Sequence, residues 1–277
     1  MYRVSKVLNN NGVIAIDMEE NQEYVILGKG VGFGKKVSQR FDKPEECTMY
    51  RLAQETERGS AKELVKGIEP EYLEIADAIL TEAQKVFGAS IDRGILFPLA
   101  DHISFAVARI RRNEQISNPL TEDIKVLFYS EFKVAETLKT ILKERLQIEI
   151  DDHEVGYVAL HIHSAIGDEK VSVAMQTARA VRECIDMIEK ATGKPIDVLS
   201  LSYNRLMNHM KYMVARASTG EKLNLDMNEY MLDQYPQAYE IAVDICKNLE
   251  GCIGHKLDET EIGYLAMHIQ RVYKDSV

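Results

Sequence analysis

The sequence predicts a multidomain protein in which a small β-rich N-terminal domain precedes two copies of one all-α domain. Short β-branched runs separated by turn residues occupy positions 1–41, whereas apolar residues follow helical spacing from residue 66 onward. A phrase of the helical part returns 107 residues later and keeps its register over about sixty residues. A period this long indicates duplication of a whole domain rather than a solenoid of short repeats.

The net charge of the 277-residue chain is −10, and it is unevenly distributed. Positions 1–41 hold six Lys or Arg and four Asp or Glu, a net +2, so the remainder carries −12. This asymmetry is compatible with a nucleic-acid site confined to the N-terminal domain. On charge alone, chance variation is the simpler explanation.

The cysteines and the apolar segments indicate a cytoplasmic protein. Four cysteines occur without a CxxC pair, and their spacing matches no disulfide or zinc pattern. The N-terminus lacks the apolar core of a signal peptide, and no apolar stretch approaches the ~20 residues of a membrane-spanning helix.

Three strand signals and one turn signal define the N-terminal domain. "YRVSKVL" (2–8), "VIAID" (13–17) and "EYVILG" (23–28) read as strands, and "NNNG" (9–12) reads as a turn. The glycine-rich "GKGVGFGKK" that follows matches neither a dinucleotide fingerprint nor a P-loop. "TMYRLA" suits a last short strand within a linker over 42–65. A domain this small is expected to need a partner copy for stability.

A helix is predicted over residues 69–87. Pro70 suits its first turn, and the apolar side chains recur with the spacing of one buried face. These side chains are Tyr72, Ile75, Ala76, Ile79, Leu80, Ala83 and Phe87.

The repeat aligns the segments 66–170 and 171–277 as two copies of one helical domain. Shifting by 107 residues places His102 on His209 and His161 on His268. Asp-x-x-Glu opens the last helical phrase of each copy and resembles a capping box, with Asp accepting from first-turn amides. The other matched pairs include Arg109/Arg216, Asp151/Asp258, Glu154/Glu261 and Tyr157/Tyr264.

The four repeated histidines allow three interpretations. Each could be a hydrogen-bonded core residue, a metal ligand or a phosphoryl acceptor. Metal is disfavoured because no HxxxH, HExxH or carboxylate at ligand spacing accompanies them. A neutral imidazole is nucleophilic near pH 7, and phosphorylation would add up to about two negative charges at one point. The residues alone leave the core and phosphoacceptor interpretations about level.

The whole chain resembles the BglG/LicT family of transcriptional antiterminators, most closely its glucose-type (GlcT-like) branch. "KVLNNNG" and "LGKGVGFGKK" resemble the family's RNA-binding domain. "ADHISFAVAR" with "EVGYVALHIHSA" resembles its first phosphotransferase-system (PTS) regulation domain, and "NHMKYMVAR" with "EIGYLAMHIQRV" resembles the second. The resemblance implies a small antiparallel β-sheet RNA-binding domain over 1–59, followed by two helical bundles over 66–170 and 171–277.

The resemblance also implies what the N-terminal domain does. It is expected to dimerise and to clamp an RNA hairpin in an operon leader, which prevents formation of an overlapping terminator. Asn side chains offer donors and acceptors, and an aromatic ring stacks on an unpaired base. Core packing is the alternative role for the aromatic residue, Phe33. The implied RNA-binding residues are Lys6, Asn9, Asn11, Gly28, Lys29 and Phe33.

For the two regulation domains, the resemblance implies phosphohistidines at His102, His161, His209 and His268. The expected donors are the phosphocarrier HPr and a sugar-specific enzyme II. Phosphorylation of the first domain is expected to inactivate the protein, and that of the second to favour the active dimer. Asp101 is expected to orient its neighbour His102, and His163 to be a bystander. No cofactor, metal or enzymatic activity is implied.

Two other classes of function remain to be compared with the sequence. A DNA-binding transcription activator could carry the same regulation domains, but the N-terminal domain has no helix-turn-helix pattern. A metal-dependent enzyme is the third class. Glucose is the first expectation for the sugar, and a β-glucoside the second.

Overall fold

The computed structural model describes residues 1–52, 55–56, 59–88, 91–167, 170–197 and 200–275. It divides into two compact units. Unit 1 comprises Met1–Asn118 and Ser130–Val171, and unit 2 comprises Pro119–Tyr129 and Ser172–Val277.

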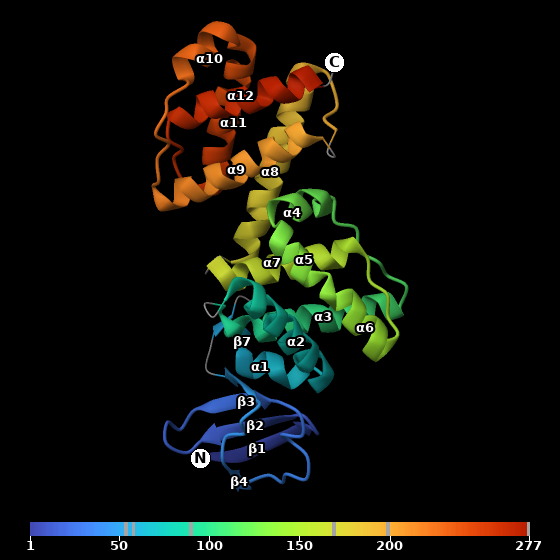
Figure 1. The fold of residues 1–277 in the computed structure, drawn as a ribbon. Coiled ribbons are helices and arrows are strands. Elements are labelled where there is room, and N and C mark those ends of the chain that lie inside the picture. Colours follow the sequence, from blue (N-terminus) through green and yellow to red (C-terminus); the bar gives the residue numbers. More distant parts are fainter. Residues whose placement is uncertain (53–54, 57–58, 89–90, 168–169, 198–199, 276–277) are drawn as a thin grey trace. The chain divides into compact units, whose positions relative to one another are not determined.

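Unit 1 begins with a five-stranded antiparallel sheet, the order being β4-β1-β2-β3-β5 (Figure 1). We call residues 1–52 with this sheet the head. The predicted strands are confirmed, and β4 is a strand that the sequence pattern missed. The strands are β1 (Tyr2–Asn9), β2 (Gly12–Asp17), β3 (Glu23–Leu27), β4 (Arg40–Phe41) and β5 (Thr48–Arg51).

The predicted turn joins β1 to β2. Asn9 pairs with Gly12, so the loop consists of Asn10 and Asn11, as expected for a two-residue hairpin rich in Asn. Alternate side chains of β2, one side chain of β3 and one of the glycine-rich segment build the core of the head, since strand residues alternate between the faces of a sheet. That core consists of Val13, Ala15, Ile26 and Val31.

The glycine-rich segment lies against this turn. The Gly32 amide donates to the Asn10 carbonyl (2.9 Å), and the Gly28 amide donates to the Asn11 carbonyl (2.9 Å). A Cβ on Gly32 would lie 2.0 Å from the Asn9 carbonyl oxygen, so this contact requires glycine.

Helical structure begins earlier than predicted. A short hairpin, β6 (Glu55–Thr56) and β7 (Gly59–Ser60), leads into α1 (Ala61–Gly67), where the sequence had suggested a linker. Ala61 and Val65 are buried at i, i+4 spacing, which gives the short helix an apolar stripe too brief to recognise by periodicity.

The predicted helix over 69–87 is confirmed as α2 (Pro70–Phe87), with Pro70 in its first turn. Its predicted apolar face is buried except for Phe87, which is partly exposed. The rest of unit 1 is helical: η1 (Arg93–Ile95), α3 (Leu96–Arg111), α5 (Tyr129–Ala135), α6 (Thr137–Leu146) and α7 (Asp152–Gly167).

Unit 2 is entirely helical in its described part. It contains a helix, α4, that by sequence belongs to the first copy. The buried Tyr203 hydroxyl of α9 donates to the Asp123 carboxylate of α4 (3.1 Å). The helices are α4 (Thr121–Leu127), α8 (Val171–Thr192), α9 (Leu201–Thr219), α10 (Asn228–Gln234), α11 (Pro236–Ile253) and α12 (Thr260–Asp275). Among described residues, no helix combines the length and apolarity that crossing a bilayer requires.

Half of the capping-box expectation holds. Asp151 accepts from the amides of His153 (3.0 Å) and Glu154 (3.2 Å), and Asp258 accepts from the Thr260 amide (3.1 Å). The carboxylate of the glutamate in each motif does not complete a capping box, because it is bound by an arginine of another helix.

Candidate functional site

The two repeated histidines of unit 2 lie together between α9 and α12. The rings of His209 and His268 stack with their centroids 4.9 Å apart. The ring of Tyr264 also stacks on His209, with a centroid distance of 6.2 Å. Nε2 of His209 lies 3.6 Å from Oε2 of Glu261. Arg216 holds that carboxylate with two bonds, from Nε (2.6 Å) and from one terminal nitrogen (2.9 Å).

Unit 1 repeats this arrangement between α3 and α7. The rings of His102 and His161 are 5.5 Å apart, and Tyr157 lies 5.6 Å from His102. Nε2 of His102 lies 3.3 Å from Oε2 of Glu154. Arg109 donates to the other oxygen of Glu154 at 2.8 Å.

Helical spacing explains why these side chains converge. The first histidine and the arginine are seven residues apart on one helix, and so share a face two turns apart. Glutamate, tyrosine and the second histidine follow at i, i+3 and i+7 on the partner helix. We call these five side chains the histidine site of each copy: His102, Arg109, Glu154, Tyr157 and His161, and His209, Arg216, Glu261, Tyr264 and His268.

The electrostatics keep the imidazoles of the second copy neutral. Burial, with His268 and Arg216 nearby, lowers the pKa of His209 to about 3. Burial, with Arg271 and Arg205 nearby, lowers the pKa of His268 to about 4. Both rings therefore keep a free nitrogen lone pair at neutral pH, as a nucleophile requires.

Glutamate is the anionic member of the site. Burial by itself would raise the pKa of Glu154, but its contacts with His102 and Arg109 outweigh burial and lower that pKa. A buried carboxylate near an imidazole nitrogen favours the tautomer that carries the proton on that nitrogen. In the second copy, the hydrogen bonds of Glu261 raise the pKa of Arg216.

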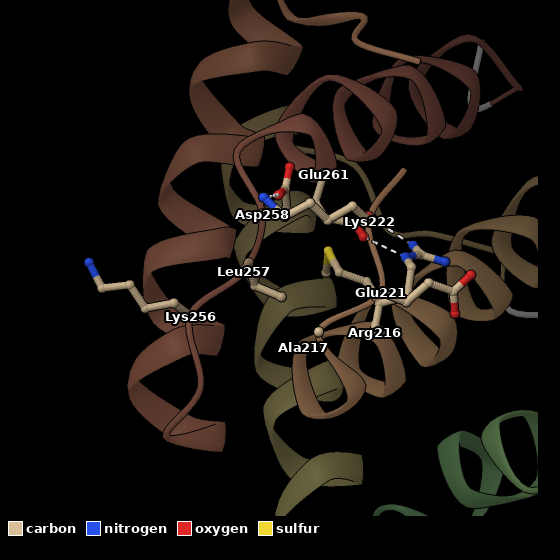
Figure 2. A pocket seen from close by; sticks show the side chains of 10 residues that line it. Arg216, Ala217, Glu221, Lys222, Lys256, Leu257, Asp258 and Glu261 are labelled. Carbon is tan, nitrogen blue, oxygen red and sulfur yellow. Dashed lines mark hydrogen bonds and ion pairs between the residues drawn. The ribbon is translucent and has the colours of Figure 1, made fainter. Parts of the chain in front are cut away.

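A pocket of about 170 Å³ adjoins the histidine site of unit 2. Figure 2 shows Arg216 and Glu261 directed at one another on its wall, with Lys222 paired to Asp258 nearby (3.2 Å). The equivalent place in unit 1 has no room for a water-sized molecule. Ile110 stands there in place of Ala217, so a larger side chain occupies the space.

The remaining histidines and Asp101 lie outside this constellation. The carboxylate that contacts His102 belongs to Glu154, and the orienting role of Asp101 stays a prediction. His163 contacts Glu131 through Nδ1 (2.9 Å), and Nδ1 of His153 accepts from the Asn118 amide (3.3 Å). Groups of three or more side chains able to hold a metal are absent from the described residues.

The sequence-predicted RNA-binding residues lie in the head, around the β1–β2 turn and the glycine-rich segment. Phe33 is 74% exposed, so the core-packing alternative for its ring is wrong. Lys6 and Lys29 are exposed. A Cβ on Gly28 would lie 2.5 Å from the Glu46 carbonyl oxygen, so internal packing already requires glycine there. Asn9 and Asn11 are only partly exposed.

Sequence reasoning found the histidines and missed the roles of their partners. The Asp-x-x-Glu pattern predicts a capping role for Glu154 and Glu261. It predicts no role for the other partners, Arg109, Arg216, Tyr157 and Tyr264. The signal was present, since all five positions of the site repeat at an interval of 107 residues.

Family comparison agrees with this layout. Residues 2–59 match the CAT RNA binding domain, and residues 77–165 and 182–272 each match the PRD domain. The chain belongs to the CAT–PRD family of transcriptional antiterminators. The resemblance drawn from the sequence is thereby confirmed, as is the division into a β-sheet domain and repeated helical domains.

Relatives with established names cover almost the whole antiterminator. The GlcA/glcB genes antiterminator of Staphylococcus carnosus is 31% identical, over 97% of this chain and 94% of its own length. The transcription antiterminator LicT of Bacillus subtilis is 28% identical, over 99% of this chain and all of its own. A crystal structure of GlcT CAT-PRDI superposes with a TM-score of 0.52 and 29% identity, covering 60% of this chain and 98% of that one.

These findings decide between the classes of function. The relatives are regulators of transcription, and the head matches an RNA-binding domain rather than a DNA-binding one. The protein is therefore an RNA-binding antiterminator, and the DNA-binding activator is not favoured.

Proposed function

We propose that the antiterminator binds a hairpin in the leader RNA of a sugar-PTS operon, as a cytoplasmic homodimer, under control of histidine phosphorylation. HPr and a sugar-specific enzyme II are the proposed phosphoryl donors, and glucose is the first candidate sugar. The observation that carries this proposal is the histidine site, which the two copies form from the same five residue types. Selection for packing alone would not require a buried carboxylate beside each imidazole pair.

Phosphoryl acceptance accounts for each member of the site. The neutral imidazole attacks the phosphorus of the phosphorylated donor with its lone pair, and the bond from phosphorus to the donor side chain breaks, so the donor leaves with that electron pair. The glutamate stabilises the positive charge that develops on the ring. The arginine keeps the glutamate charged. The antiterminator then returns the phosphoryl group and catalyses nothing else.

The phosphoryl group also supplies a means of switching. It adds about two negative charges at neutral pH, and these compete with the nearby carboxylate for the guanidinium. Arg109 in unit 1 and Arg216 in unit 2 join two helices through their glutamates, so a change of partner would loosen the packing of those helices.

In the head, we propose that Lys6 and Lys29 contact phosphates, that Asn9 and Asn11 supply polar contacts, and that Phe33 stacks on a base. Gly28 permits the close approach of the backbone. An exposed aromatic side chain in a glycine-rich loop supports this assignment, because stacking on an unpaired base gives it a partner.

A gel-shift experiment tests the RNA surface. The full chain is titrated against the leader hairpin of the neighbouring sugar-transport operon, with a scrambled hairpin and matched duplex DNA as controls. Phe33→Ala is expected to weaken hairpin binding about tenfold or more, since stacking contributes roughly 1–3 kcal/mol per base. Val37→Ala, which removes another exposed side chain of the head, should leave binding unchanged. Equal binding of RNA and DNA would reject the proposal.

A reporter experiment tests the regulation. His102→Ala should give antitermination without inducing sugar, because the inhibitory phosphorylation is lost. His163→Ala serves as the control, since His163 lies outside the histidine site. Unchanged sugar dependence in His102→Ala would remove His102 from the inhibitory role.

A further inference from the structure

Glu74, on helix α2 of unit 1, binds two asparagines of the head. Nδ2 of Asn9 donates to Oε1 of Glu74 at 2.6 Å, and Nδ2 of Asn11 donates to Oε2 at 3.2 Å. The Glu74 side chain is 19% exposed, and Arg145 lies 3.7 Å from Oε2. One carboxylate thus engages both side chains of the β1–β2 turn to which we assign RNA contacts.

The orientation of both asparagine amides is fixed within the head. The Asn9 side-chain oxygen accepts a hydrogen bond from the backbone N–H of Asn11 (2.8 Å). The Asn11 side-chain oxygen accepts one from the backbone N–H of Gly30 (3.0 Å). With the oxygens used in this way, the NH2 groups are the donors that each asparagine can offer outside the head. Both of these donors are directed at Glu74.

A second contact of α2 holds the head beside Glu74. The buried Tyr50 hydroxyl of β5 donates to the Asp77 carboxylate, and Arg93 donates to the same hydroxyl at 3.2 Å. Glu74 and Asp77 are three residues apart and so share one face of α2. The helix therefore presents two carboxylates to the head, one to a buried tyrosine and one to the turn.

We propose that Glu74 competes internally with RNA for Asn9 and Asn11. This inference rests on the proposed RNA-binding role of the two asparagines. The carboxylate offers two anionic oxygens to the two amides, as a phosphate group would, and it must leave before an RNA acceptor can take its place. Its charge also repels an approaching phosphate. RNA then binds only the fraction of chains in which Glu74 is displaced, which lowers the apparent affinity.

The test measures RNA affinity of the full chain with Glu74→Ala. Hairpin binding is expected to tighten at least about fivefold, because the competing arrangement no longer holds the two amides. Glu82→Ala is the matched control: Glu82 is an acid on the same helix, and it pairs with Lys85 rather than with the head. Its affinity should equal that of the wild type. Glu74→Gln, which keeps the size of the side chain, substitutes if Glu74→Ala unfolds.

A measurement without RNA examines the contact directly. In protein labelled with 15N at asparagine, the side-chain amide signals of Asn9 and Asn11 should shift in Glu74→Ala and stay in place in Glu82→Ala. Signals that do not move would overturn the inference, whatever the RNA result.

The outcomes separate this inference from the proposed function. If wild type binds the hairpin and Phe33→Ala loses it, while Glu74→Ala binds no more tightly than wild type, the inference fails and the RNA surface stands. If neither wild type nor any Glu74 variant binds the hairpin, both fail. Binding by Glu74→Ala alone would support both, and would mean that the contact fully blocks the wild type.

Discussion

Nε2 of His102 lies 3.3 Å from Oε2 of Glu154, and the equivalent atoms of His209 and Glu261 lie 3.6 Å apart. Nε2 is buried in His102 and His209, whereas Nδ1 is buried in His161 and His268. We therefore expect the two histidines of a site to accept a phosphoryl group on different nitrogens.

This difference predicts the chemical form of each phosphohistidine. His102 and His209 should be phosphorylated on Nδ1, and His161 and His268 on Nε2, because the opposite nitrogen is buried in each ring. Phosphorus NMR of the chain after incubation with phosphorylated HPr or enzyme II distinguishes the two isomers. Variants that keep one histidine at a time assign the signals. Phosphate on Nε2 of His102 would contradict the prediction.

Removing the charge of Glu154 should slow the phosphorylation of His102. Glu154→Gln keeps the shape of the side chain and loses the anion that stabilises the charged ring, so we expect a decrease in rate of about tenfold or more. The measurement is phosphoryl transfer from the purified donor in single turnover. Glu149→Gln, which changes an exposed acid of the same unit, should transfer at the wild-type rate.

The stability of the second copy should fall in mild acid. The pKa values of His209 and His268 are about 3 and 4 in the folded chain, against 6.5 ordinarily. Between pH 6.5 and 4 the unfolded chain binds protons that the folded chain does not, so stability is constant above this window and decreases as the pH falls through it. Each histidine contributes a slope of up to about 1.4 kcal/mol per pH unit.

Urea unfolding of the full chain at several pH values checks this dependence. Replacing His209 and His268 with Gln should flatten the profile in that window. His255→Gln, at an exposed position of the same unit, should leave the slope as it is. An equal slope in the double variant would assign the acid sensitivity to other groups.

Gly32→Ala should unfold the turn of the head. Its Cβ would meet the Asn9 carbonyl oxygen at 2.0 Å and the Gly12 carbonyl oxygen at 3.0 Å, and backbone atoms on both sides cannot move aside. We expect a loss of more than about 2 kcal/mol in the stability of the sheet, measured by amide hydrogen exchange in β1 and β2. Gly67→Ala, at a position with open space around it, should change little.

Tyr50→Phe should weaken the hold of α2 on the head. The variant leaves the partly buried Asp77 without its tyrosine donor, and a lost donor to an acceptor shielded from water costs about 1–3 kcal/mol, with the lower end expected here. Hydrogen exchange across β5 and α2 reports the change. Tyr24→Phe removes an exposed hydroxyl that donates to Glu20 (3.0 Å) and should have a smaller effect. Equal protection in the two variants would mean that Tyr50 does not anchor the head.

The parts that sequence reasoning predicted are those governed by local rules. Alternation and turn residues located β1, β2 and β3, and the repeat located the four histidines. The two-residue β4 and the seven-residue α1 were missed because such short elements carry too little periodicity. The contacts of Glu74 could not be inferred, since they join residues 65 and 63 positions apart.

Glu154 illustrates a different difficulty. Its position three residues after Asp151 fits a helix cap, so a local rule already explained it and concealed the tertiary role. The repeat showed that the residue type is kept in both copies, but the same is true of a cap. Only the packing of α7 on α3 distinguishes the two roles, by placing the carboxylate against Arg109 and His102.

Helix α4 belongs to the first copy by sequence and to unit 2 by packing. Ile124 and Leu127 of this helix are buried, and Asp123 is bonded to Tyr203. A fragment that ends at residue 170 would therefore expose the apolar face of α4, and Asp123 would lose its hydrogen bond from Tyr203. The copies that the repeat defines therefore do not coincide with the units that packing defines, and a fragment cut at the repeat boundary leaves the second copy without a helix that bonds to α9.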